Sequence, residues 1–433
     1  MPGRPPPRSR ARGIAGSFVW MISAASLACG DAADGSGTAS RASVRDSAGV
    51  EIVENSIPGD AGAAIVTADT PSLVIGAVEG DESQQLHRVH DALRLPDERI
   101  AVLNAGSHEV RIYGADGSLD VAFGRQGDGP SEFAGFPYQL ELLPPDTLVI
   151  WDIRTWETSW FLADGTFLRK EPGRTEYEAH VPEGRRAEGG YAVPGKGLLL
   201  RIHDFGAQRP EGEVYVPSME LTFFAGEGEL RNLGDFGGSE QVASHAPGRP
   251  TSAMIPFATS GITAFGGRPA RVWAGRNDRY ELRQFTGDGR LERIVRADRT
   301  ARAVTSEQVD RWIAGMRDAM IDGGAPPDII EWQVEALEGA PAREFMPVFD
   351  GVHVTVDGGA WVRRSAGADA WVRGRPVRYD VFGPDGRWRG LAEMTRPVSP
   401  IEIGDDYLLG VRRNDLSVEF VELYELETAT PAD

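Results

Sequence analysis

The chain has 433 residues, of which 53 are glycine and 29 are proline, a composition typical of many short strands joined by turns. Its 45 basic and 65 acidic side chains give a formal net charge of −20. Such an acidic protein repels a phosphate backbone, which excludes ordinary nucleic-acid binding. A single cysteine excludes a disulfide bond within the chain.

The N-terminal segment has the three parts of a secretory signal peptide. Residues 1–12 contain four arginines and no acid, an apolar stretch runs from Gly13 to Ala28, and that stretch ends in small residues. The stretch is shorter than the ~20 residues that a membrane-spanning helix needs. We therefore predict that residues 1–28 are a signal peptide and that the protein is exported.

Cys29 follows this segment directly, and Ser26-Leu27-Ala28-Cys29 resembles the lipobox of bacterial lipoproteins. Ser26 stands where that family prefers leucine. The resemblance implies lipidation of Cys29, with simple secretion as the alternative. Residues 29–43, rich in small residues, are predicted to be a flexible tether. By analogy with lipoproteins, Gly30 after the cysteine favours the outer membrane or cell surface, so the lipid anchor would be the only membrane contact.

An aromatic residue followed three and four places later by an acid and a glycine recurs along the rest of the chain. Acid-glycine pairs suit tight hairpin turns because glycine adopts positive φ without steric cost. A short apolar run, typical of a strand, lies upstream of each turn. The repeated aromatic residues are Tyr113, Phe161, Phe224, Phe285 and Phe382, and Tyr424 stands in the same place without the glycine.

Units of this kind are typical of four-stranded propeller blades, which must pack around an axis to bury both faces. We predict an all-β fold, a six-bladed β-propeller over residues 44–428. The last unit, ending near Leu426, lacks its outer hairpin. Residues 50–54 alternate between apolar and acidic side chains, so we expect this strand to complete the last blade and close the ring.

The long interval between Phe285 and Phe382 predicts a helical insertion at about residues 305–340. Thr305 and Gln308 have the spacing of a capping box, and apolar residues follow at helical intervals. The paired prolines at 326–327 separate a second short helix. The helices are either a pair packed on the propeller surface or a lid or partner-docking element.

The stretch from Leu95 to Gly117 resembles the NHL-type propeller repeat. Residues 124–133, Gly-Arg-Gln-Gly-Asp-Gly-Pro-Ser-Glu-Phe, resemble the glycine-rich signature of bacterial six-bladed β-propeller lipoproteins, with Ser131 where the family has glycine. The resemblance implies the fold but no particular activity. Without the spacing of a phosphate-binding loop, residues 124–129 are predicted to be a turn leading into the next blade.

Polar residues follow the second strand of several units, at Asn104, Asp152, Asp204 and Asn277. Such residues commonly cap turns. Propellers with related repeats include calcium-dependent lactonases and an amidating lyase, so the resemblance also implies a possible metal site at the channel mouth. His87 and His90 lack a third ligand nearby, which disfavours a zinc site.

A second set of candidates pairs aromatic with cationic side chains at strand ends, namely Trp151, Arg154, Trp361 and Arg363. These residues could bind an anionic or sugar-like ligand at the channel mouth, or they could be blade packing with solvated arginines. No Gly-x-Ser-x-Gly motif or other catalytic motif is present, so no catalytic residue is predicted.

The sequence therefore predicts an exported, lipid-anchored binding module of the cell envelope. We expect a monomer that binds an unidentified protein or small molecule and needs no cofactor. The alternatives are a calcium-dependent lactonase, other hydrolase or lyase with its site at the channel mouth, and a rigid scaffold.

Overall fold

The computed structural model describes residues 42–59, 62–171, 173, 177–204, 209–225, 230–246, 249–371 and 375–429. These residues all belong to one compact unit. The predicted signal peptide, Cys29 and nearly all of the tether lie outside the described residues. Within the described part, no helix has the length and apolar character required to cross a bilayer.

Most described strands form six groups of four, each an antiparallel meander, which we call blades 1 to 6. Blade 1 consists of β5 (Val89–Arg94), β6 (Ile100–Asn104), β7 (Glu109–Tyr113) and β8 (Leu119–Phe123). Blade 2 consists of β9 (Pro137–Leu143), β10 (Thr147–Asp152), β11 (Thr158–Leu162) and β12 (Phe167–Glu171). Blade 3 consists of β13 (Arg185–Val193), β14 (Gly197–Asp204), β16 (Met219–Phe224) and β17 (Leu230–Asp235). Blade 4 consists of β20 (Gly261–Gly266), β21 (Arg271–Arg276), β22 (Glu281–Thr286) and β23 (Leu291–Ala297). Blade 5 consists of β24 (Phe349–Val354), β25 (Ala360–Arg364), β26 (Val377–Phe382) and β27 (Trp388–Met394). Blade 6 consists of β28 (Val398–Ile403), β29 (Tyr407–Arg413), β30 (Glu419–Thr428) and β4 (Leu73–Ile75).

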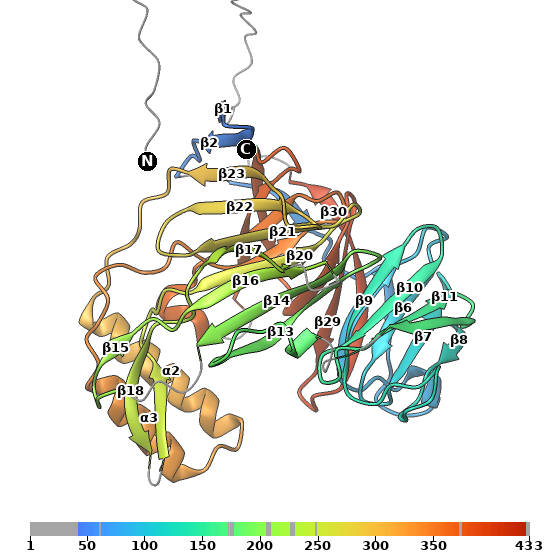
Figure 1. The fold of residues 1–433 in the computed structure, drawn as a ribbon, viewed down its shortest axis with the longest axis horizontal. Helices are drawn as coiled ribbons and strands as arrows, with labels where there is room; N and C mark the ends of the chain where they lie inside the picture. The colour runs from blue at the N-terminus through green and yellow to red at the C-terminus, as the bar shows by residue number, and fades with distance from the viewer. Residues whose placement is uncertain are drawn as a thin grey trace, which may run out of the picture. The chain divides into compact units, whose positions relative to one another are not determined.

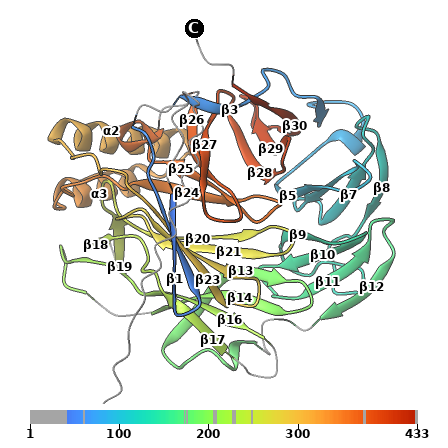
Figure 2. The same ribbon diagram turned by 90° about the horizontal axis from the view of Figure 1, so that it is seen from above.

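The first strands of neighbouring blades lie side by side around the axis. Strand β5 contacts both β9 and β28, and β24 contacts both β20 and β28. In Figure 2, β5 and β9 lie toward the middle of the ring, whereas β8 and β12 lie at its outside. This repeated radial arrangement is that of a β-propeller, so the predicted all-β propeller with a helical insertion is confirmed.

Five of the repeated aromatic residues end or nearly end the third strand of their blades, whereas Tyr424 lies four residues before the end of β30; all six are buried. The acid-glycine pairs then form the turn into the fourth strand. Gly117 and Gly386 adopt φ values of 81° and 74°, which a side chain would disfavour. The pair at 227–228 lies outside the described residues. The repeat therefore marks a buried strand end followed by a hairpin.

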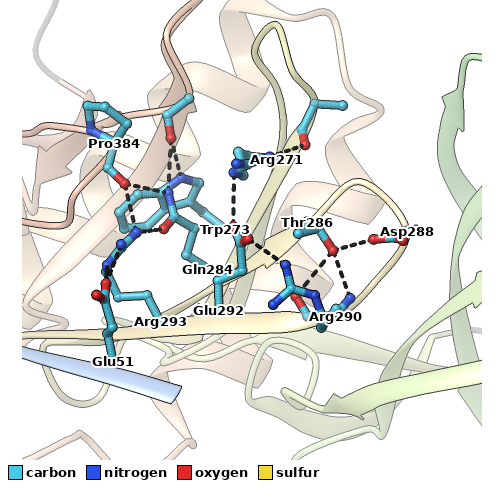
Figure 3. A network of polar contacts seen from close by, with 12 residues as sticks. Glu51, Arg271, Trp273, Gln284, Thr286, Asp288, Arg290, Glu292, Arg293 and Pro384 are labelled. Atoms are coloured by element: carbon cyan, nitrogen blue, oxygen red, sulfur yellow. Dashed lines mark hydrogen bonds and ion pairs between the residues drawn. The ribbon is translucent and has the colours of Figure 1, made fainter. Parts of the chain in front are cut away.

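The N-terminal strand does not close the ring, and that prediction was wrong. Strand β2 (Val50–Asn55) forms a hairpin with β1 (Ala42–Ser47) and pairs in parallel with β23 at the outer edge of blade 4. Arg293 of β23 binds Glu51 and also donates to the Pro384 carbonyl at 2.7 Å, as Figure 3 shows. The acidic side chains of β2 therefore match the arginines of the blade 4 edge.

Blade 6 is completed by β4, which pairs antiparallel with β30. Ile75 of β4 is fully buried in a cluster that includes Leu409 and Val421 of blade 6 and Ile100 of blade 1. Strand β3 (Ala63–Thr67) pairs with both β27 and β30. The ring is thus closed by β4 and not by β2. Strand β4 is short and apolar because its side chains must fill the interface between two blades.

The strands of a blade alternate in direction. The loop from the second to the third strand and the loop from one blade to the next therefore lie at the same end of every blade. We call this end the insertion face. Apart from β1, β2 and β3, it carries every additional element that the structure describes: η1 (Glu82–Gln84), β15 (Val214–Tyr215), β18 (Gln241–Ala246), β19 (Arg249–Met254), α2 (Ser306–Asp322), α3 (Pro327–Glu338) and η2 (Gly367–Trp371).

The predicted helical pair is present. Thr305 and Gln308 exchange the two hydrogen bonds of a capping box at the start of α2. Buried Trp312 and Leu337 pack in one cluster with Val242 of β18, so the helices share a small core with the inserted strands. Figure 1 shows α2 and α3 beside β15 and β18.

Candidate functional site

The four residues predicted as turn caps or metal ligands lie on the insertion face, each at the end of a different blade's second strand or just after it. In three blades the side-chain oxygen accepts a hydrogen bond from the backbone N–H of the loop that leads into the same blade's first strand. These bonds are Asn104 from His87 at 2.7 Å, Asp152 from Gly135 at 3.0 Å and Asn277 from Ser260 at 2.7 Å. The recurring contact is that of a turn cap that ties two connections together.

Asp152 accepts two further bonds, from the N–H groups of Arg154 and Thr155, both at 2.9 Å. Asp204 instead forms a 3.0 Å ion pair with Arg185. Within the described residues, no three His, Cys, Asp or Glu side chains converge closely enough to hold a metal ion. Asn104, Asp152 and Asn277 thus cap separate blade turns, and Asp204 pairs with an arginine at a fourth.

The predicted aromatic and cationic ligand residues have different surroundings. Trp151 is 0 % exposed and Trp361 is 3 % exposed, and each belongs to a hydrophobic cluster. Arg363 pairs with Asp350, while Arg154 is exposed. The two indole rings therefore pack in hydrophobic clusters of the blades, while both arginines are at least partly exposed.

A cleft of about 830 Å³ opens on the insertion face over blades 3 and 4 and beside β15 and β18. Its volume is that of a small-molecule site. Asp204 is the one previously named candidate in its lining. Charged groups of both signs line it: Glu188, Asp204, Asp235, Asp278, Glu281, Arg209, Arg276, Arg279 and Arg283.

Hydrogen bonds fix the wall of the cleft where blade 3 meets blade 4. Arg276 donates to the carbonyl of Gly238 at 3.1 Å and to the hydroxyl of Thr259 at 2.7 Å. Asp235 accepts from the N–H groups of Gly237 and Met219 at 2.8 and 3.0 Å. Burial would raise the pKa of Asp235, but these hydrogen bonds outweigh it and lower the pKa, so this carboxylate is ionised at neutral pH.

Two aromatic rings add apolar surface to the lining. The guanidinium of Arg209 lies 4.5 Å from the centre of the Tyr215 ring, and the Tyr215 hydroxyl donates to Gln241 at 3.0 Å. Arg283 lies 5.6 Å from the centre of the Phe236 ring. The cleft therefore combines aromatic surface with donors and acceptors and has nearly balanced charge, which suits a polar ligand of low net charge.

A separate cavity of about 150 Å³ lies at the propeller axis among the first strands. Asp91 of blade 1 accepts from the Leu140 N–H at 2.8 Å, and Glu402 of blade 6 is paired with Arg268. Burial raises the pKa of Asp91 well above its ordinary value and that of Glu141 to about 7. The cavity thus holds a carboxyl group that titrates near neutral pH.

Sequence reasoning did not identify the axis carboxylates or most of the cleft. A signal for Glu141 and Glu402 existed, because each acid interrupts an otherwise largely apolar first strand, whereas Asp91 lies in a strand that also carries His90 and Arg94. The cleft residues come from separate loops of two blades, and no spacing in the sequence connects them.

No family model matches the chain, and no curated protein matches it. Among solved structures it is similar to a protein of Bacteroides fragilis that is described as exported, at 9 % identity and a TM-score of 0.44, covering 88 % of this chain and 100 % of that one. It is similar to a DUF4221 family member from Bacteroides vulgatus, at 11 % identity and a TM-score of 0.46, covering 84 % and 99 %. It is also similar to a gluconolactonase of Xanthomonas campestris, at 12 % identity and a TM-score of 0.35, covering 83 % and 99 %.

Proposed function

We propose that this protein is a β-propeller binding module whose cleft over blades 3 and 4 holds a polar, nearly uncharged ligand of the saccharide class. The observation that carries the proposal is the 830 Å³ cleft. Five carboxylates and four guanidiniums nearly balance in its lining, so neither a strongly anionic nor a strongly cationic ligand is favoured. Tyr215 supplies a ring and Gln241 an amide, the two kinds of group that hydroxyl-rich ligands contact.

The test is binding of the chain from residue 30 onward to an array of bacterial and plant oligosaccharides, followed by calorimetry with the best glycan. We expect Tyr215→Ala and Gln241→Ala each to weaken that binding at least tenfold, a loss of about 1.4 kcal/mol. Phe345→Ala removes an exposed aromatic residue outside the cleft and serves as the matched control. No retained glycan, or equal affinities for the two cleft variants and the wild type, would contradict the proposal.

We also propose that the protein is exported and held at the cell envelope by a lipid on Cys29. The arginine-rich start, the apolar stretch and the cysteine directly after it support this proposal. Residues 30–41 would then separate the lipid from the first described strand.

Expression with radiolabelled palmitate and fractionation of the cells test this lipidation and localisation. We expect label in the membrane fraction for the wild type and a soluble, unlabelled protein for Cys29→Ser. An unlabelled wild type recovered outside the cytoplasm would support simple secretion instead, and a cytoplasmic wild type would contradict export.

A further inference from the structure

A cavity of about 260 Å³ on the insertion face, between blades 4 and 5, has a lining with one sign of charge. Its eleven lining residues include five arginines and no acidic residue: Arg299, Arg302, Arg364, Arg375 and Arg378. The chain as a whole has 20 more acidic than basic groups. The positive charge of this lining is therefore opposite in sign to the net charge of the whole chain.

Two of these arginines are positioned by one carboxylate behind the cavity. Asp380 is 0 % exposed and accepts from Arg364 at 2.7 Å and from Arg299 at 3.2 Å. Tyr280 donates to the other carboxylate oxygen at 3.0 Å. One negative charge cannot neutralise two guanidiniums, so this buried group holds the arginines in place and leaves a positive charge in excess.

The other three arginines of the lining form fewer hydrogen bonds and ion pairs. Arg302 donates to the Ser365 carbonyl at 2.9 Å, and Arg378 pairs with Glu393 at 2.6 Å. Arg375 forms no hydrogen bond or ion pair with any residue that the structure describes. Arg375 and Arg302 therefore both bring a positive charge to the cavity that no carboxylate of the described chain neutralises.

We propose that this cavity is a binding site for a phosphate group, carried by a small ligand or by a lipid headgroup. Guanidinium groups bind tetrahedral oxyanions through paired N–H donors, and several together favour a doubly charged anion over a carboxylate. The cavity volume leaves room beside the phosphate for a second anionic group or a small substituent. None of its lining residues lines the cleft over blades 3 and 4, so this site adds a second ligand to the proposed function.

The first experiment is titration calorimetry of the chain from residue 30 onward with sodium pyrophosphate in low-salt buffer. We expect saturable binding at one site, weakened at least tenfold in Arg375→Gln. Arg375 forms no hydrogen bond or ion pair with a described residue, so this variant is expected to fold, and an unchanged melting temperature checks that. The control is Arg317→Gln, which removes an exposed arginine of α2 that lies outside the cavity and is expected to bind pyrophosphate like the wild type.

Two further probes separate the sources of the phosphate. Glucose 6-phosphate represents a small ligand, and vesicles containing phosphatidic acid, assayed by co-sedimentation, represent a lipid headgroup. Arg375-dependent binding of either probe supports the site and identifies the source. No saturable pyrophosphate binding by the wild type, or equal affinities in Arg375→Gln and the wild type, would overturn the proposal.

Discussion

The side-chain oxygen of Asn55 accepts a 2.8 Å hydrogen bond from the backbone N–H of Trp388, which lies 333 residues further along the chain. The amide nitrogen of the same side chain donates to the Gly386 carbonyl at 3.0 Å. Asn55 is the last residue of β2, at the edge of blade 4, while Gly386 and Trp388 belong to blade 5. Because its nitrogen also donates to the Arg296 carbonyl of blade 4 at 3.1 Å, one buried amide joins the N-terminal hairpin and two blades.

Replacing Asn55 with alanine should destabilise the propeller, because a buried N–H and a buried carbonyl would lose their partner. We expect a loss of about 3 kcal/mol in the free energy of unfolding, measured by urea denaturation. Ser56→Ala, at the exposed neighbouring position, should cost less than about 1 kcal/mol. Equal losses for the two variants would show that the amide does not join the blades.

Closure of the ring by β4 predicts a strong difference between adjacent residues. Ile75 is fully buried between blades 6 and 1, whereas Val74 is 45 % exposed. Ile75→Ala should lower the free energy of unfolding by about 3 kcal/mol through lost burial and a cavity. Val74→Ala, measured in the same denaturation series, should cost less than about 1 kcal/mol. A tolerated Ile75→Ala would contradict closure at this strand.

The axis cavity predicts a pH dependence of stability. Burial raises the pKa of Glu141 from 4.5 to about 7, so between these values the folded state binds more protons than the unfolded state. Stability from this group is complete below about pH 4.5 and is lost as the pH rises through 7. Glu141→Gln should therefore reduce the loss of stability between pH 5 and pH 8 by on the order of 2 kcal/mol.

Denaturation of the wild type and Glu141→Gln at the two pH values measures this difference. Exposed Glu79→Gln is the control, and its pH profile should follow that of the wild type. A Glu141→Gln profile parallel to the wild type would mean that the carboxyl group titrates at an ordinary value.

The turn caps predict that metal removal leaves stability unchanged. Asp152 accepts three backbone N–H groups, which together account for its role in the turn. We expect Asp152→Ala to cost about 2 kcal/mol and the wild-type melting temperature to be the same in EDTA and in calcium. Stoichiometric calcium by elemental analysis, or a rise in melting temperature with calcium, would instead favour the metal-dependent enzyme.

Sequence patterns were enough to predict the repeated unit and the inserted helices, because both depend on residues a few positions apart. An aromatic residue that ends a strand, such as Phe382, and the acid-glycine turn after it are local features. The capping box of Thr305 is equally local, and it marked the start of α2 correctly.

The strand that closes the ring and the side chains that meet could be identified only from the packing of the blades. Residues 50–54 and 73–75 are both acceptable strands in sequence. Their places differ because the blade edges differ. The acidic strand of residues 50–54 pairs with the arginine-bearing β23, and the apolar strand of residues 73–75 pairs with β30 beside an apolar interface. The cleft, the axis carboxylates and the arginine cavity are likewise assembled from different blades. Their chemistry arises from distances between residues far apart in the chain, and those distances are set by the packing of the blades around the axis.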